Sequence, residues 1–311
     1  MDYTLHQLRV FREIAKTKSV TKAAQNLHLS QPAVSIQLRK LQDQFEIPLT
    51  EVIGRQIYIT DFGEEVAEAC DRILEEVYTL KHRTLAHRGF LTGQLKVSVV
   101  STAKYVMPYF LTAFLAEHKG IDIRMDVTNK ATVLQNLANN EIDFAMVSVL
   151  PTDMGIERVE LMPNKLFLVG SQRRVKELDT IDDKLLETSL MIYRELGSAT
   201  RQAMEDFLKS RALPLSKRME LTSNEAVKQA VMSGLGYSVL PLIGLKNEIA
   251  NGSVQIIPFE GLPIVTSWNL IWLKNKKFSP AAAAYLQYIR DHKDDIIQNH
   301  FKWYDDFTLE S

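Results

Sequence analysis

The sequence predicts an α/β protein with a small helical head, a long linker helix and a larger two-lobed body. Three observations predict this fold class. Two short amphipathic helices joined by a tight turn lie within residues 1–60, and one long amphipathic helix without proline covers Phe62–Leu85. Beyond Gly93, apolar strands alternate with amphipathic helices, which is typical of lobes built on parallel strands. We expect a head at 1–60, a linker helix with a hinge at 61–92, and a body at 93–311.

The head begins with a helix whose apolar side chains recur at helical spacing. These are Leu5, Leu8, Phe11 and Ile14. Residues 19–42 then form two shorter helices, the first of which buries Ala24 and Leu27. The turn after it ends in Ser30, a good N-cap acceptor, and Pro32 fits the next first turn, where no backbone donor is lost. Two helices joined in this way form a helix-turn-helix, whose shape fits the major groove of DNA.

The second helix of this pair has two faces of different character. Its core stripe consists of Val34, Leu38, Leu41 and Phe45. A separate arc, which is free to meet DNA, consists of Gln31, Pro32, Ser35, Ile36 and Arg39. Glutamine can form a bidentate hydrogen bond with adenine, isoleucine can contact a thymine methyl, and arginine can reach phosphate or guanine. An ordinary amphipathic helix in an unrelated domain would show the same spacing.

Two short apolar runs around a tight turn predict a β-hairpin after these helices. The runs are Ile47–Leu49 and Gln56–Thr60, and the turn holds Gly54 and Arg55. A hairpin beside a helix-turn-helix is a wing, and Arg55 at its tip can enter the minor groove or contact phosphate. The alternative for Arg55 is a solvated turn residue.

The long helix predicted over Phe62–Leu85 carries an apolar seam. The seam consists of Val66, Ala69 or Cys70, Ile73, Val77 and Leu80. A small winged domain does not need so long a helix, so we expect a partner helix to cover the seam in a two-fold homodimer. Such a dimer would also place two reading helices on a two-part operator in double-stranded DNA. The alternative is that the seam lies against the body of the same chain. Gly89 and Gly93 then bracket a short hinge.

Strands and helices alternate along the body. The expected strands are Leu95–Val100, Ile121–Val127, Asp143–Val149, Lys165–Val169, Leu190–Tyr193, Tyr237–Leu240, Val254–Ile257 and Ser267–Leu273. The expected helices lie near Tyr105–His118, Val133–Asn139, Thr200–Arg211, Glu225–Ser233 and Pro280–Ile297. The last strand and helix return to the first lobe, so lobe 1 covers about 93–162 and 267–298, and lobe 2 about 163–266. We expect the crevice between the lobes to be a small-molecule site.

Composition excludes several classes of function. The net charge is −1, but residues 1–60 hold eight basic and five acidic residues, a charge of +3 that leaves −4 for the rest and suits a DNA-reading head. No apolar run reaches the roughly 20 residues that span a bilayer, and the start shows no signal-peptide pattern, so we expect a cytoplasmic protein without a membrane partner. One cysteine, Cys70, excludes an internal disulfide. The histidines form no metal-ligand pattern and no nucleophile or phosphate-loop motif is present, so no enzyme activity, cofactor or metal is expected.

A set of residues in the head forms a distinctive pattern. It consists of Ala23, Ala24, Leu27, the run Ser30-Gln31-Pro32-Ala33-Val34-Ser35 and Leu38, followed by Gly54, Arg55, Thr60 and Gly63. This pattern resembles the N-terminal signature of LysR-type transcriptional regulators, and the linker helix and two-lobed body extend the resemblance over nearly the whole chain. The wing departs from it, because Leu49-Thr50-Glu51-Val52 stands where the family usually has Leu-Phe-Glu-Arg. One customary aromatic side chain and one cation are therefore missing.

Several stretches of the body resemble the subgroup that controls Calvin-cycle and RuBisCO operons. They are Val100–Tyr105, Asn140–Asp143, Gly197–Arg201, Ser223–Ala230, Gly234–Gly236 and Gly261–Ile264. The resemblance implies a winged helix-turn-helix and a periplasmic-binding-protein-like effector domain. It also implies base contacts by Gln31, Pro32 and Ser35, and a minor-groove contact by Arg55. A homotetramer, formed as a dimer of dimers, is implied as well, and RNA polymerase is a candidate partner.

Seven polar residues at strand ends and helix starts mark the expected effector site. They are Ser101, Thr102, Lys104, Ser148, Thr200, Arg201 and Asn224. Helix N-termini with free N–H groups favour an anion, and the lysine and arginine supply cations, so we expect a small anionic effector. As alternatives, the hydroxyls and Asn224 are plain helix caps, Ser148 is a satisfied strand-end residue, Lys104 is solvated, and Arg201 pairs with Glu205.

The sequence thus predicts a metabolite-responsive, sequence-specific DNA-binding regulator. One alternative is the same architecture sensing an unrelated amino acid or carboxylate, and another is an architectural DNA-binding protein without an effector. A free-standing solute-binding protein would not need the winged head. The tail at 299–311 carries Phe301, Trp303, Tyr304 and Phe307 among acidic residues, and could dock on a neighbouring lobe or on another subunit.

Overall fold

The structure is a computed structural model that describes residues 2–54, 56–86, 91–213 and 217–307, with backbone alone for residues 75, 78–86 and 217. The chain divides into two compact units, Met1–Phe90 and Leu91–Ser311. Within the described ranges, no helix combines the length and the apolar character needed to cross a membrane.

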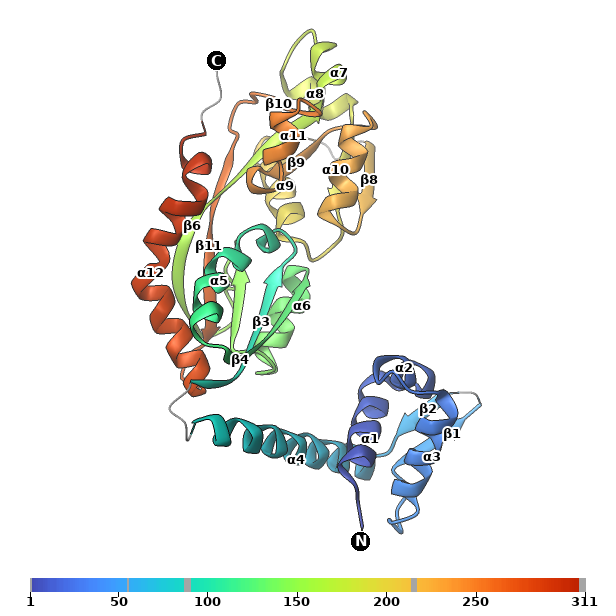
Figure 1. Cartoon of the computed structure of the whole chain (residues 1–311). Coiled ribbons are helices and arrows are strands. Elements are labelled where there is room, and N and C mark those ends of the chain that lie inside the picture. The colour runs from blue at the N-terminus through green and yellow to red at the C-terminus, as the bar shows by residue number, and fades with distance from the viewer. Residues whose placement is uncertain (1, 55, 87–90, 214–216, 308–311) are drawn as a thin grey trace. The chain divides into compact units, whose positions relative to one another are not determined.

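The first unit is the head, in which short helices pack against the start of a long one. Its elements are α1 (Leu5–Thr17), α2 (Val20–Asn26), α3 (Gln31–Gln42), β1 (Thr50–Ile53), β2 (Gln56–Ile59) and α4 (Asp61–Ala86) (Figure 1). The side chains of Thr4, Ser19 and Ser30 accept backbone N–H bonds and cap α1, α2 and α3. The helices bury Phe11, Ile14, Val34 and Leu41. The predicted helix-turn-helix is confirmed, with the core stripe on the predicted face of α3.

The first strand of the wing lies later in the chain than predicted. It was expected at Ile47–Leu49, whereas β1 covers Thr50–Ile53 and pairs antiparallel with β2. Pro48 has no N–H to donate to a strand partner, and the N–H of Leu49 instead donates to Gln42 Oε1 at 2.6 Å. The hairpin turn includes Gly54, with a φ of +65°. Arg55 lies outside the described residues.

The first part of the α4 seam lies against the head of its own chain. Cys70 is buried in a cluster with Leu8 and Phe11, and Val66 packs against the same cluster. The cover of this part of the seam is thus the head of the same chain, which neither the partner-helix expectation nor its alternative had named. Ile73 is 43% exposed, so the seam remains open farther along the helix. Leu80 belongs to the part of α4 for which only the backbone is described.

The second unit is the body, an α/β structure with a mixed main sheet. Its strands are β3 (Thr92–Val100), β4 (Gly120–Thr128), β5 (Phe144–Val147), β6 (Ile156–Ser171), β7 (Leu190–Arg194), β8 (Lys217–Leu221), β9 (Ser238–Pro241), β10 (Val254–Ile256) and β11 (Ile264–Leu273). Its helices are η1 (Ala103–Tyr105), α5 (Met107–Glu117), α6 (Lys130–Ala138), α7 (Gln172–Lys176), α8 (Asp183–Thr188), α9 (Ala199–Ser210), α10 (Asn224–Met232), η2 (Leu242–Gly244), α11 (Lys246–Ala250) and α12 (Pro280–Asp305).

The main sheet joins the two lobes of the body. In the described part of the chain its strand order is β10-β6-β11-β5-β3-β4, with β9 also paired to β6. As predicted, β3 is parallel to β4 and β5. The strand β8 was not predicted, and it pairs parallel with β7 in a second small sheet. The return of the last strand to lobe 1 is confirmed, since β11 pairs with β5. The long strands β6 and β11 run antiparallel to each other between the lobes (Figure 1).

The β6–β11 pair differs from the prediction and contains an irregularity. The strand expected at Lys165–Val169 is only the second half of β6. The first half was missed because polar side chains such as Glu157 and Glu160 interrupt its apolar pattern. The pairing register shifts between Ser267 and Asn269 of β11, which marks a β-bulge or similar distortion.

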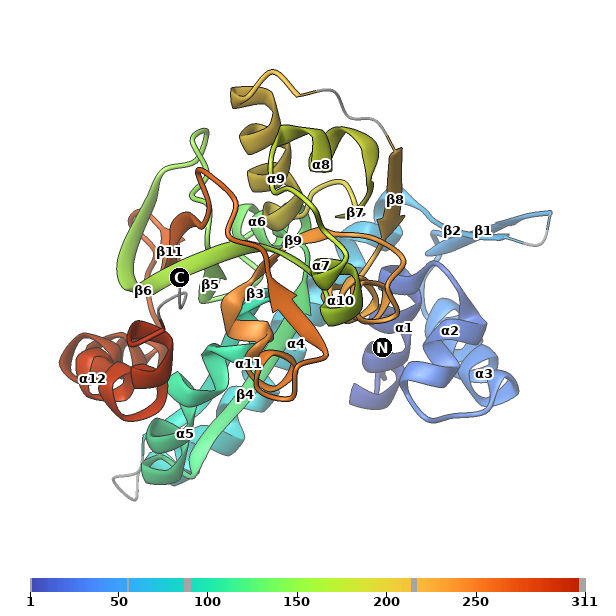
Figure 2. The same ribbon diagram turned by 90° about the horizontal axis from the view of Figure 1, so that it is seen from above.

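Helix α12 packs beside α5 and extends farther than predicted (Figure 2). Its last turns bury Phe301 and Tyr304 in the main core of the body. The Tyr304 hydroxyl accepts a hydrogen bond from the Lys165 N–H of β6 at 2.6 Å, and Trp303 lies under the Lys246 ammonium of α11. The described part of the tail therefore docks on its own body, as one of the two alternatives held.

Candidate functional site

The predicted DNA-facing arc lies on the exposed side of α3. Its members, Gln31, Pro32, Ser35, Ile36 and Arg39, are all solvent-exposed. Ile36 is 52% exposed, so the arc includes one large apolar side chain that a partner can reach. The cap at Ser30 fixes the start of this helix, so the polar side chains of the first turns project together. This face can offer hydrogen bonds and one apolar contact to base edges.

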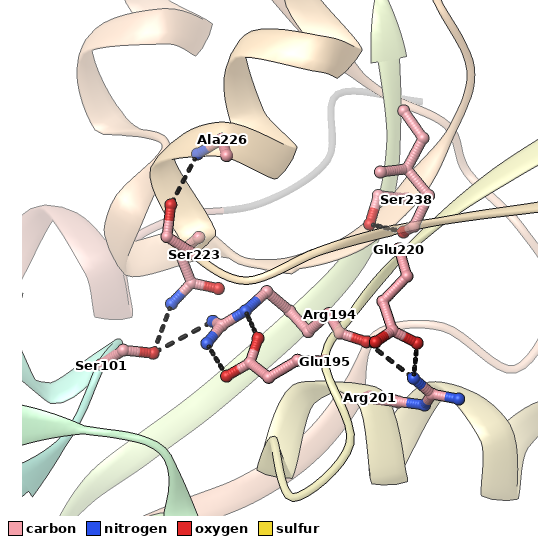
Figure 3. A network of polar contacts seen from close by, with 10 residues as sticks. Ser101, Arg194, Glu195, Arg201, Glu220, Ser223, Ala226 and Ser238 are labelled. Carbon is pink, nitrogen blue, oxygen red and sulfur yellow. Dashed lines mark hydrogen bonds and ion pairs between the residues drawn. The ribbon is translucent and has the colours of Figure 1, made fainter. Parts of the chain in front are cut away.

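In the body, residues from separate elements meet at the ends of β3 and β7. Ser101 follows β3, Arg194 ends β7, and Asn224 opens α10. Arg194 Nη1 donates to Ser101 Oγ at 3.0 Å, and Asn224 Nδ2 donates to the same oxygen at 3.1 Å (Figure 3). The Ser101 hydroxyl thus joins the expected first lobe to β7 and α10 of the second lobe. Ser101 and Asn224 were predicted for this site.

Arg194 is a site residue that the sequence reasoning missed. Its side chain is only 3% exposed, and Nε and Nη2 donate to the two carboxylate oxygens of Glu195, each at 2.8 Å. A bidentate carboxylate is the strongest neutralising partner available to a guanidinium. Its place in the sequence could have identified it, because Arg194 directly follows the apolar run Leu190–Tyr193 and a charged residue there stands at the end of a strand, at the edge of the crevice.

Arg201 is paired with carboxylates, as one of the alternatives held. Its Nε donates to Glu205 at 2.7 Å, and its Nη1 donates to Glu220 and, at 3.1 Å, to the carbonyl oxygen of Arg194. Burial lowers the pKa of Arg201, but the hydrogen bonds that it donates to Glu205 and Glu220, with the charges of these carboxylates, outweigh burial and raise the pKa above its ordinary value. The guanidinium is therefore permanently charged and holds the backbone of Arg194 in place.

The helix-cap alternatives for Thr200 and Asn224 are wrong. The N-caps of α9 and α10 are Ser198 and Ser223, and Ser223 Oγ accepts the N–H of Ala226 at 3.0 Å (Figure 3). Thr200 and Asn224 lie inside these helices, and both are buried. The Oδ1 atom of Asn224 has no hydrogen-bond partner within the described chain. A buried acceptor without a partner is costly, so this amide is available to a ligand or ordered water.

The other predicted residues lie near the same strand ends. Thr102 and Ser148 are buried, at 5% and 8% exposure, and Thr102 makes no side-chain cap bond to η1. Lys104 is half-buried, with its ammonium 5.0 Å from the Tyr105 ring centroid, so the solvated alternative is only partly correct.

Lys228 was not predicted. Its ammonium bonds Glu248 at 2.6 Å and Glu225 at 3.1 Å, and it lines a small cavity with Tyr105 and Asn224.

A second set of contacts joins the start of α6 to the start of α9. Lys130 Nζ donates to Gln202 Oε1 at 3.2 Å, and the N–H of Ala131 donates to the carbonyl of Gly197 at 3.3 Å. Gly197 has a φ of +85°, which a glycine adopts without strain. Burial lowers the pKa of Lys130, partly offset by Asp153 and Asp206. The crevice is thus bridged at two places in this structure.

The described side chains contain no group of three or more histidine, cysteine, aspartate or glutamate residues that could hold a metal ion. Cys70 is buried in the head, and burial raises the pKa of its thiol to about 11. It is therefore a packing residue of α4 rather than a nucleophile at neutral pH.

Comparison with protein families gives two matches that together cover most of the chain. Residues 5–64 match the bacterial regulatory helix-turn-helix protein, lysR family, and residues 88–294 match the LysR substrate binding domain. The HTH-type transcriptional activator CmpR of Synechocystis sp. is 37% identical over 295 residues, which cover 94% of this chain and 97% of that protein. The RuBisCO operon transcriptional regulator of Allochromatium vinosum is 36% identical over 290 residues, which cover 93% and 96%.

Solved structures show the same architecture. The regulatory domain of CcmR from Synechocystis, in complex with 2-PG, superposes with a TM-score of 0.61 at 30% identity, covering 66% of this chain and 99% of that one. Full-length CbnR complexed with its target DNA superposes with a TM-score of 0.65 at 21% identity, covering 93% and 99%. The second likeness concerns the fold alone.

Proposed function

Because the chain belongs to the LysR family of transcriptional regulators, we propose that it controls genes of carbon dioxide fixation in response to a small anion bound between the two lobes of its body. Relatives that regulate RuBisCO operons, at 35–36% identity over more than nine-tenths of the chain, support the target genes. The observation that carries the effector site is the buried polar cluster of Ser101, Arg194 and Asn224. The CcmR domain bound to 2-PG supports a phosphorylated carboxylate as the class of effector.

The proposed contacts to this anion come from polar residues around the crevice. They are Ser101, Thr102, Lys104, Ser148, Thr200 and Asn224, together with Arg194. We assign Arg201 an indirect role, because it holds the carbonyl of Arg194 and is itself paired with two carboxylates. The chain would act by binding alone, with no catalytic step.

For DNA, we propose that α3 reads base edges with its exposed arc, Gln31, Pro32, Ser35 and Ile36, while Arg39 and Arg55 contact phosphate or the minor groove. Two copies joined through α4 would present two reading helices to a two-part operator, and dimers would pair into a tetramer. Contact with RNA polymerase and a cytoplasmic location belong to the same proposal. The exposed Ile73 of α4 supports a partner helix on the open part of the seam.

The coupling between the two sites would be a population shift. We propose domain limits at 1–60, 61–92 and 93–311, with lobes that meet where β6 and β11 cross near residues 162 and 266. An anion that binds one degree of lobe closure more tightly shifts the body toward that form. In an assembly, the same shift changes how far apart the DNA-binding heads are held.

A ligand screen with operator binding as its readout tests the proposal. Selection from genomic DNA supplies the operator, and 2-phosphoglycolate, phosphorylated sugars, simple carboxylates and amino acids are then titrated into the full-length protein. We expect saturable binding of a phosphorylated carboxylate. Ser101→Ala and Asn224→Ala should each weaken it by about tenfold, as expected for loss of a buried hydrogen bond, and leave operator affinity unchanged without ligand.

Each alternative has its own outcome in this screen. Binding of an amino acid or an unrelated carboxylate alone would identify a different sensor with the same architecture. An operator complex that responds to no ligand would identify an architectural protein. Equal affinity for all duplexes would refute the DNA-reading assignment itself.

A further inference from the structure

We infer that Glu195 occupies the anion position of the effector site, so that an anionic effector binds Arg194 by displacing the Glu195 carboxylate. This inference rests on the proposed function and specifies how the same site is regulated. The two carboxylate oxygens of Glu195 fill the fork formed by Nε and Nη2 of Arg194, at 2.8 Å each (Figure 3). A phosphate or carboxylate group of a ligand presents the same pair of oxygens to a guanidinium.

Glu195 fills the Nε/Nη2 edge of the Arg194 guanidinium in this structure. Two of its nitrogens bond Glu195, and the third donates to Ser101. Because the side chain is only 3% exposed and Arg201 holds its backbone carbonyl, Arg194 cannot swing out to meet a ligand in solvent. An incoming anion that binds this edge through two oxygens must therefore take the place of Glu195.

Glu195 is the partner that can leave. Its side chain is 15% exposed, and it lies in the turn between β7 and α9, next to Leu196, which is 72% exposed. A carboxylate that rotates from this turn into water regains its hydration, so its release costs less than exposure of the arginine. Ser101, in contrast, is fixed at the end of β3.

The groups beside the fork are ready to hold an anion. Ser101 Oγ accepts hydrogen bonds from both Arg194 and Asn224, and within the described chain its own hydroxyl proton is donated to no acceptor. An effector oxygen in the place of Glu195 could therefore accept from Arg194 and from the hydroxyl of Ser101 together. A neutral ligand could not compete with the charged carboxylate, so the device selects for anions.

Displacement of Glu195 also reaches the contact between the lobes. The turn that carries Glu195 continues to Gly197, whose carbonyl accepts the N–H of Ala131 at the start of α6. When the Glu195 carboxylate leaves Arg194, the turn loses the ion pair that holds it, and this turn is the one that bridges the crevice. Effector binding and lobe closure would thus share one short segment, residues 195–198.

The test compares Glu195→Gln with Glu260→Gln in the full-length protein. Glutamine keeps the shape of the side chain but cannot form the charged bidentate pair, whereas Glu260 pairs with Arg211 at the surface and controls for loss of one negative charge. Calorimetric titration with 2-phosphoglycolate should show about tenfold tighter binding to Glu195→Gln than to the wild type, and no change for Glu260→Gln. Arg194→Gln should weaken binding by at least the same factor.

Thermal unfolding provides a second readout that a purely structural pair would not produce. Without ligand, Glu195→Gln should unfold at a lower temperature, because Arg194 loses its partner, while the upward shift caused by 2-phosphoglycolate should be larger than in the wild type. Unchanged or weaker binding by Glu195→Gln, with normal binding by the wild type, would overturn this inference alone. If neither protein bound 2-phosphoglycolate or any other anion in the screen, the inference and the proposed effector site would both fall.

Discussion

Two tyrosines of α12 allow a matched test of the packing that holds the C-terminal helix. Tyr304 and Tyr285 are both fully buried. The hydroxyl of Tyr304 accepts the N–H of Lys165, whereas the hydroxyl of Tyr285 has no hydrogen-bond partner among the described residues. Tyr304→Phe leaves a part-buried amide unsatisfied, which costs about 1–2 kcal/mol. Tyr285→Phe removes an orphaned hydroxyl and should be neutral or stabilising by up to about 1 kcal/mol.

Thermal unfolding of the two variants measures the difference. For a body of this size, about 1 kcal/mol corresponds to roughly 2–4 °C in Tm, so Tyr304→Phe should unfold about 2–8 °C below the wild type and Tyr285→Phe at or slightly above it. Both variants remove the same atom from the same helix, so each controls for the other. Equal losses in the two variants, or a loss of more than about 1 kcal/mol in Tyr285→Phe, would refute the assignment of the Lys165–Tyr304 bond as a stabilising tether.

Three further predictions concern the head and the crevice. Cys70 should react slowly with Ellman's reagent at pH 8, because burial raises the pKa of its thiol from 9.0 to about 11. The contribution of the neutral thiol to stability should be complete below pH 9 and lost as the pH rises through about 11. Rapid labelling of the folded protein would contradict this. Arg39→Ala should reduce the salt dependence of operator binding, measured by salt titration, by about one phosphate contact. Gln31→Ala should relax the base preference at one operator position, measured by repeated selection. An unaltered salt slope or an unaltered base preference would exclude the corresponding contact. Gly197→Ala should destabilise the body by about 1–2 kcal/mol in thermal unfolding and weaken effector binding. Alanine is strained at positive φ, and its Cβ would lie 3.1 Å from the Cβ of Ala131. A fully stable variant would show that the turn adapts to the new side chain.

Local patterns predicted the elements whose burial repeats with the period of the backbone. The core stripe of α3 follows from such a pattern, and β5 and the second halves of β3 and β11 follow from short runs of buried side chains. The first half of β6 was missed because it carries Glu157, Arg158 and Glu160, which are exposed to solvent. The misplaced β1 has a different cause. Its position depends on Pro48 and on the bond from Leu49 to Gln42, neither of which produces an apolar run.

The candidate site shows the same division between local and tertiary information. Ser101 and Asn224 were predictable, because a strand end and a helix start can be located from the sequence. Arg201 was singled out because it stands at the start of a helix. Its pairing with Glu205 follows from their four-residue spacing, but the burial of the pair does not. Arg194 becomes significant only when folding brings it to Ser101, which is 93 residues away in the chain.

The register shift in β11 has a mechanical consequence for the body. It lies beside Ser267, which pairs with Pro163 of β6, a residue that cannot donate a backbone hydrogen bond to its neighbour. Regular pairing between these two strands is therefore interrupted at one level, and we expect the ribbon to be most easily deformed there. We therefore expect the lobes to close by rotation about this level of the ribbon rather than by sliding past each other.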